Sequence, residues 1–172
     1  MVEMIIENDD ETLYLLLEKV LSKLYNSLSS PGSSQFQPTG EKQAMREKIL
    51  IVEDNPRNMR LIEMTLRSNN YILLKATDGE TALDMAVREQ PDLILMDIRL
   101  PGMNGLDVTR ALRKTPAFSH TPIIGLTAHA MKGDKERVLE SGCDAYLSKP
   151  INTRELPGII AEMLSQRQKA NP

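Results

Sequence analysis

Short apolar runs alternate with amphipathic stretches along most of the chain after Lys48. The runs are Ile49–Val52, Tyr71–Ala76, Leu93–Met96, Ile123–Leu126 and Ala145–Leu147. Four of them are continuously or almost continuously apolar, as in strands of a parallel sheet that is covered on both faces. The amphipathic stretches have helical periodicity and cover Arg57–Ser68, Gly79–Glu89, Gly105–Lys114, Lys132–Ser141 and Thr153–Gln166. This alternation of strands and helices predicts a doubly wound α/β fold.

Three residues near the predicted helix ends support these boundaries. Pro56 suits the first turn of a helix, where a missing N–H costs no hydrogen bond. Asp78 can accept a hydrogen bond at a helix N-cap, and Gly142 can take the left-handed conformation that often follows a helix. We therefore expect helices to begin or end at these three residues.

The composition excludes several classes of protein. Of the 172 residues, 41% are hydrophobic and 26% are charged, which is typical of a soluble globular chain. The single cysteine, Cys143, excludes an internal disulfide framework and a Cys-based zinc site. No apolar run approaches the ~18 residues of a membrane span, so we expect a cytoplasmic protein without membrane contact. With a net charge of −3 and no tryptophan, direct nucleic-acid binding is not expected.

Residues 1–44 differ from the rest of the chain. They have a net charge of −4, whereas residues 45–172 have a net charge of +1. An amphipathic helix is predicted within residues 1–28 from the apolar stripe Leu13, Leu17, Val20, Leu24 and Leu28. Residues 29–46 include the sequence SSPGSSQFQPTG, which is too polar to pack and predicts a flexible linker. The main domain is expected over residues 47–168, with a tail over residues 169–172.

The role of the N-terminal helix is open at this point. It can fold back on the main domain, or it can pair with a second copy or with a partner's helix. A start-site artefact is a third alternative, because Met45 is itself a natural beginning for the domain that follows.

Polar and charged side chains follow the predicted strands. The first strand is followed by Glu53 and Asp54, the third by Asp97, the fourth by Thr127 and the fifth by Lys149. Carboxyl ends of parallel strands share one edge of the sheet, so these groups are expected to converge. Oxygen ligands without His or Cys favour Mg²⁺ over Zn²⁺. Any one strand-end Asp can simply cap a helix, but that explanation does not account for the whole set.

The chain resembles the receiver domain of two-component response regulators over roughly residues 47–166. Four motifs carry the resemblance: ILIVEDN (49–55), DLILMDIRLPGMNGLD (92–107), PIIGLTAHAM (122–131) and CDAYLSKPI (143–151). Their spacing matches too, because Asp54 lies 43 residues before Asp97, while Thr127 and Lys149 lie 30 and 52 residues after it. The resemblance implies a flavodoxin-like (βα)5 sheet with strand order 2-1-3-4-5.

The same resemblance implies the chemistry of the acidic site. Asp97 would be the phosphoacceptor. Asp54, Asp97 and the backbone carbonyl of Arg99 would hold Mg²⁺, and Glu53 would act through a metal-bound water. Arg99 and His129 occupy positions that modulate the rate of dephosphorylation in this family.

Further residues are assigned from the resemblance on the later strands. Thr127, Lys149 and the backbone N–H of Ala128 would contact the phosphoryl group. Thr127 and Tyr146 would form a switch pair, in which the ring turns into space that the hydroxyl vacates. The Lys149–Pro150 peptide bond would be cis.

The expected function is that of a phosphorylation-activated response regulator. The phosphoryl group would come from a phosphohistidine of a sensor histidine kinase or a histidine phosphotransfer protein. The helix over 132–141, the strand over 145–147 and the helix over 153–166 would form the output face toward a downstream effector protein. A homodimer could use this face or the N-terminal helix. The protein would catalyse only its own phosphorylation and dephosphorylation, so it is not expected to be an enzyme. Because 22 residues follow Pro150, no separate output domain is expected.

Three alternatives remain. The motifs resemble both single-domain receivers of the bacterial cell-cycle type and receivers of hybrid histidine kinases, from which this one could be cut. An aspartate-nucleophile phosphatase of the dehalogenase type would need a second Asp where Arg99 stands. A nucleotide-binding flavodoxin-like module would need a phosphate-cradling glycine loop after Val52, which the sequence lacks.

Overall fold

The structure is a computed structural model that describes residues 46–128 and 134–170. The predicted N-terminal helix, the linker up to residue 45 and His129 lie outside these residues. The described residues belong to the second of two units into which the chain divides, Arg46–Pro172.

A five-stranded parallel sheet forms the centre of this unit, in the order β2-β1-β3-β4-β5. Its strands are β1 (Lys48–Val52), β2 (Ile72–Ala76), β3 (Leu93–Asp97), β4 (Ile123–Thr127) and β5 (Ala145–Ser148). The predicted fold class and strand order are confirmed, and every predicted strand end lies within one residue of the observed one. The side chains of β3 and β4 are buried throughout, and only Lys48 of β1 is partly exposed. The outer strands β2 and β5 are half-buried.

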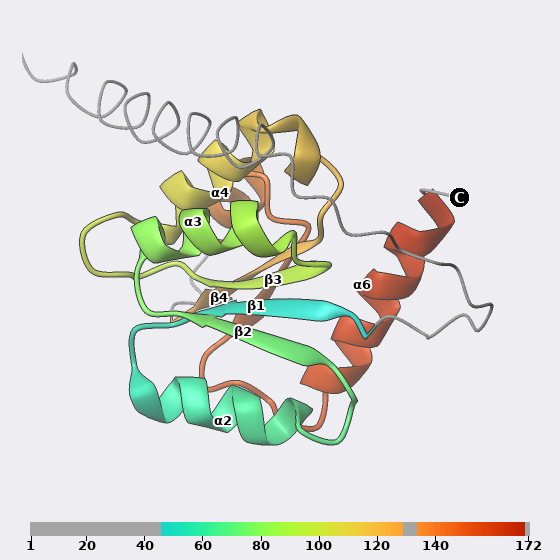
Figure 1. Cartoon of the computed structure of the whole chain (residues 1–172). Helices are drawn as coiled ribbons and strands as arrows, with labels where there is room; N and C mark the ends of the chain where they lie inside the picture. Colours follow the sequence, from blue (N-terminus) through green and yellow to red (C-terminus); the bar gives the residue numbers. More distant parts are fainter. Residues whose placement is uncertain (1–45, 129–133, 171–172) are drawn as a thin grey trace, which may run out of the picture. The chain divides into compact units, whose positions relative to one another are not determined.

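Helices cover both faces of the sheet, as Figure 1 shows: α2 and α6 lie on one face, and α3 and α4 lie on the other. The described helices are α2 (Pro56–Leu66), α3 (Gly79–Glu89), α4 (Gly105–Lys114), α5 (Asp134–Glu140) and α6 (Leu156–Ala170), with a 3-10 turn η1 at Pro116–Phe118. The apolar sides of α2 and α6 pack on alternate residues of β1, such as Ile49 and Ile51. None of the described helices is both long enough and apolar enough to cross a lipid bilayer.

The helix caps follow the prediction. Pro56 is the first residue of α2. The side chain of Asn55 caps this helix by accepting hydrogen bonds from the backbone N–H groups of Arg57 and Asn58. Asp78 caps α3 and accepts from the backbone N–H of Thr81 at 2.8 Å. Gly142 follows α5 with a positive φ of 103°, a conformation that favours glycine.

One predicted helix was misplaced: α6 begins three residues after the expected start at Thr153 and ends at Ala170. The Asn152 side chain accepts from the backbone N–H of Arg154, and this turn replaces the expected first helical turn. The helix then continues beyond Gln166, because the residues that follow have high helix propensity.

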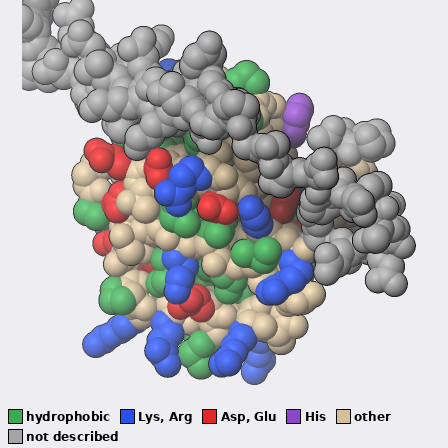
Figure 2. Space-filling view, viewed as in Figure 1, with side chains coloured by type: hydrophobic (Ala, Val, Ile, Leu, Met, Phe, Trp, Pro, Cys, Tyr) green, Lys and Arg blue, Asp and Glu red, His purple; other side chains and the backbone are tan. Residues whose placement is uncertain are grey.

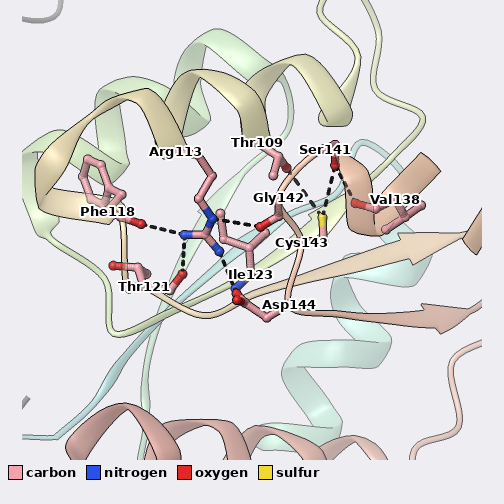
Figure 3. Close-up of polar contacts among 10 residues, drawn as sticks. All are labelled: Thr109, Arg113, Phe118, Thr121, Ile123, Val138, Ser141, Gly142, Cys143 and Asp144. Carbon is pink, nitrogen blue, oxygen red and sulfur yellow. Dashed lines mark hydrogen bonds and ion pairs between the residues drawn. The ribbon is translucent and has the colours of Figure 1, made fainter. Parts of the chain in front are cut away.

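Arg113, near the end of α4, connects three segments at the edge of the sheet opposite the strand carboxyl ends (Figure 3). Its guanidinium donates to the backbone carbonyls of Phe118, Thr121 and Gly142 at 2.6–2.8 Å. It also donates to the carboxylate of Asp144 at 2.6 Å. The end of α4, the start of β4 and the turn between α5 and β5 are therefore fixed to one another.

Candidate functional site

The strand order brings the predicted site residues to one edge of the sheet. Glu53 directly follows β1, and Asp97 is the last residue of β3, the neighbouring strand. Thr127 ends β4, the next strand along, and Lys149 directly follows β5. Each residue is close to the others because parallel strands in this order all end at the same edge.

Lys149 joins the two buried carboxylates. Its Nζ donates to Glu53 Oε2 and to Asp97 Oδ2, both at 2.6 Å. The side chains of Glu53 and Asp97 are 0% and 6% exposed, so the ammonium compensates charges that water does not reach. Burial by itself lowers the pKa of Lys149, but the hydrogen bonds and charges of Asp97 and Glu53 together raise it above its usual value. Lys149 is therefore a permanent cation next to Asp97.

The backbone around Asp97 is tightly arranged. The backbone N–H of Arg99 donates to Asp97 Oδ1 at 3.0 Å, so each carboxylate oxygen has a donor. Gly105, the first residue of α4, lies against the same segment, and a Cβ there would lie 2.0 Å from the Asp97 carbonyl oxygen. Only glycine allows this approach of α4 to the end of β3.

Three carboxylates at this edge could hold a metal ion. One oxygen each of Glu53, Asp54 and Asp97 lies within 4.8 Å of the others. Asp54 is exposed, whereas Glu53 and Asp97 are buried, so the cluster opens to solvent on one side. A set of carboxylate oxygens with an open side fits Mg²⁺, which prefers oxygen ligands and keeps several waters.

The predicted switch residues lie on neighbouring strands. Thr127 is buried, and its carbonyl accepts from the backbone N–H of Lys149 at 2.7 Å. Tyr146 on β5 is half-buried, and the Nζ of Lys135 on α5 lies 5.5 Å from the centre of its ring. Its partner across the strand pair is Gly125, where an added Cβ would meet the side chains of Val138 and Ile98.

Two further predicted features follow the ends of β4 and β5. Ala128 is exposed directly after Thr127, and the Lys149–Pro150 peptide bond is cis. His129 lies outside the described residues.

Cys143 is a core residue. Its thiol is buried between the hydroxyls of Thr109 and Ser141, at 3.8 and 3.7 Å (Figure 3). Burial raises the pKa of the Cys143 thiol.

Asn58 is a site residue that the sequence analysis missed. Its side-chain amide donates to Glu53 Oε1 at 3.0 Å. A signal existed in the sequence, because Asn58 stands three residues after the helix cap Asn55, a spacing from which side chains often reach back beyond the helix start.

A family model, described as the response regulator receiver domain, matches residues 49–161. The chain belongs to this family. Membership favours the receiver over both the phosphatase and the nucleotide-binding module.

The receiver has curated relatives and solved structures that are similar to it. The polar-differentiation response regulator DivK of Brucella anthropi is 46% identical over 108 residues, which cover 63% of this chain and 88% of that protein. DivK of Brucella abortus gives the same values.

Solved structures of receivers show the same fold. The receiver domain of a sensor histidine kinase from Pseudomonas aeruginosa is 42% identical with a TM-score of 0.66, over 70% of this chain and 98% of that one. That structure has a magnesium ion coordinated in its active site cleft. A chemotaxis response regulator of Vibrio cholerae is 28% identical with a TM-score of 0.65, over 69% of this chain and 98% of that one.

Proposed function

We propose that this receiver is activated by phosphorylation of Asp97, with a phosphohistidine of a sensor histidine kinase or a histidine phosphotransfer protein as donor. One observation carries the proposal: the buried Asp97 carboxylate lies 2.6 Å from the Lys149 ammonium and within the range of a shared metal ion with Glu53 and Asp54. A carboxylate held in this way can become an acyl phosphate, because positive charge is available for the phosphoryl oxygens that it gains.

The transfer exchanges one bond to phosphorus for another. An oxygen of Asp97 forms a bond to phosphorus as the N–P bond of the phosphohistidine breaks, and the electron pair of that bond stays on the imidazole nitrogen. Lys149 neutralises part of the charge on the phosphoryl oxygens. We propose that the Thr127 hydroxyl and the backbone N–H of Ala128 donate hydrogen bonds to these oxygens.

Asp54, Asp97 and the backbone carbonyl of Arg99 would hold Mg²⁺, with Glu53 acting through a bound water. When bound, the cation supplies charge neutralisation and alignment for the transferred group. The fit rests on the three clustered carboxylates described above.

The surface of α2 beside the site suits the phosphodonor protein. Helix α2 begins one residue after Asp54 and its N-cap Asn55, and the exposed surface of α2 includes the apolar side chains Leu61 and Met64. Figure 2 shows Lys and Arg side chains gathered toward the side of the molecule on which α2 lies. A partner with an apolar contact area and acidic edges is complementary to such a surface.

The output signal is proposed to pass through α5, β5 and α6. A phosphoryl group that draws the Thr127 hydroxyl inward favours the state in which the Tyr146 ring turns into the space that the hydroxyl vacates. Because Lys135 on α5 lies over the same ring, the turn of Tyr146 also changes the surface of α5. An effector protein or a second copy of the chain would bind the altered face.

We propose that Arg99 and His129 set the lifetime of the phosphorylated state. Substitution of either residue is expected to change the rate of dephosphorylation more than the stability of the fold. Equal decay rates in the wild type and both variants would contradict this assignment.

We propose that the chain consists of an N-terminal helical extension over residues 1–28, a linker over residues 29–46 and a receiver over residues 47–168. Deletion of residues 1–44 tests the extension. Solution mass then gives the number of chains per particle, measured with and without phosphorylation. A change in that number on deletion assigns the extension to self-association, and an unchanged number assigns it another role.

The phosphorylation itself is tested by intact mass. The protein is incubated with Mg²⁺ and phosphoramidate, whose N–P bond resembles that of phosphohistidine. One phosphoryl adduct is expected for the wild type and none for Asp97→Asn or in the presence of EDTA. Turnover of many phosphomonoester molecules would instead identify an enzyme of the phosphatase type.

A further inference from the structure

The carboxylate of Glu53 is held from two sides. Oε2 accepts from Lys149 Nζ at 2.6 Å, whereas Oε1 accepts from the Asn58 side-chain amide at 3.0 Å and from the backbone N–H of Asn55 at 3.3 Å. The Glu53 side chain has no exposed surface, so these groups take the place of water. The contacts therefore determine which way each carboxylate oxygen points.

The start of α2 explains how Asn58 reaches Glu53. Asn55 is the N-cap and Pro56 the first residue of the helix, which places Asn58 at the third position. Side chains in a helix lean toward its N-terminus, so Asn58 points back toward the end of β1. In a capping box, the side chain at this position accepts from the N-cap N–H. Here the Asn58 amide and the Asn55 N–H both donate to Glu53 instead.

We propose that Asn58 is a positioning residue for cation binding. Its amide fixes the rotation of the Glu53 carboxylate and leaves Oε2 to Lys149, whose ammonium also donates to Asp97 in the metal-binding cluster. This inference rests on the proposed function, because it assigns a role at the same site.

An amide suits this role better than a charged donor would. Asn58 donates a hydrogen bond to Glu53 without adding positive charge beside a cation site. Residues that orient metal-binding groups in this way contribute strongly to metal affinity, and their loss typically weakens it by about 10–100-fold.

The test is a calorimetric titration of the full chain with Mg²⁺ in the absence of any phosphodonor. Asn58→Ala is expected to raise the Kd for Mg²⁺ by about tenfold, at the lower end of that range because Glu53 acts through a metal-bound water and Asn55 still donates to Oε1. Asn58→Leu, which keeps the size of the side chain, is expected to behave in the same way. Asn58→Gln keeps the amide and should recover most of the affinity.

A matched control separates positioning from a general effect on α2. Asn69→Ala removes the same type of side chain just beyond the other end of the helix and should leave the Kd unchanged within about twofold. Phosphorylation rates measured over a range of Mg²⁺ concentrations add a second readout. In Asn58→Ala the half-saturating concentration should rise with the Kd, while the rate at saturating Mg²⁺ stays close to that of the wild type.

Two results would overturn the inference in distinguishable ways. If the wild type binds Mg²⁺ and both Asn58→Ala and Asn58→Leu bind it equally well, Asn58 only stabilises the fold and the proposed function stands. If the wild type binds no Mg²⁺, the inference and the metal-dependent part of the proposed function fail together.

Discussion

Replacement of Arg113 by alanine is expected to destabilise the receiver far more than replacement of a neighbouring arginine on the same helix. Arg113 donates to three backbone carbonyls and to Asp144, and its side chain is only 18% exposed. Arg110 forms one ion pair, with Asp107, and both of these side chains are about half exposed. The two substitutions change helix propensity equally, so their difference isolates the buried contacts.

The magnitude follows from these contacts. Hydrogen bonds from a charged donor contribute about 1.5–3 kcal/mol each, and the partial exposure of Arg113 reduces each of its three carbonyl contacts to about 1 kcal/mol. The ion pair with Asp144, whose side chain is 47% exposed, adds at most about 1 kcal/mol. We therefore expect Arg113→Ala to lower the free energy of unfolding by about 3 kcal/mol. For Arg110→Ala, an exposed pair of this kind predicts a loss of about 0.5 kcal/mol or less.

Urea denaturation followed by circular dichroism measures both values. With an m-value of about 2 kcal/mol/M, the midpoint should fall by about 1.5 M for Arg113→Ala and by about 0.25 M for Arg110→Ala. Asp144→Asn is the second comparison, because its side chain can still accept from the backbone N–H of Ile123 and it leaves the carbonyl contacts of Arg113 intact. It should cost about 1 kcal/mol or less. Equal midpoints for the two arginine variants would show that the buried contacts of Arg113 do not stabilise the fold.

Three further outcomes are expected. Gly125→Val should destabilise the fold by about 1–3 kcal/mol in the same urea assay, because a Cβ at this position would lie 2.7 Å from a methyl group of Val138. Asp78→Ala should cost about 1 kcal/mol at pH 7 through the lost helix cap. The hydrogen bond from the backbone N–H of Thr81 is the main cause of the lowered pKa of Asp78. The stability difference between the wild type and Asp78→Ala should therefore persist at neutral pH and shrink as the pH falls through that lowered pKa. A stability difference that stays constant down to pH 2 would contradict this role of the Asp78 carboxylate. Burial raises the pKa of Cys143, so at pH 8 its thiol should react with a disulfide reagent only after unfolding, and rapid labelling of the native protein would contradict the assignment to the core.

The strands and most helix starts could be predicted from the sequence because local patterns determine them. Runs such as Leu93–Met96 are apolar on both faces, and the caps at Asn55 and Asp78 are encoded within a few residues. The start of α6 could not be predicted, because it depends on whether the residues after Asn152 form a non-helical turn or the first turn of the helix. Both are compatible with the local sequence.

The site could be predicted as a set of strand ends, but its supporting contacts could not. The convergence of Glu53, Asp97 and Lys149 follows from strand order alone. The contact of Asn58 with Glu53 depends on the direction in which α2 leaves the sheet. The requirement for Gly105 depends on the close approach of α4 to the Asp97 carbonyl. Both arise from tertiary packing, which no local pattern specifies.

Locating the phosphoryl group on the chain is the most direct test of the role proposed for Asp97. After incubation with Mg²⁺ and phosphoramidate, borohydride reduces an aspartyl phosphate to homoserine, which peptide mass spectrometry assigns to one position. Homoserine is expected at position 97, with Glu53 and Asp54 unmodified. Homoserine at position 54 would contradict the assignment of Asp97 as the phosphoacceptor. A protein that gains a phosphoryl group but yields no homoserine at any position would contradict it as well.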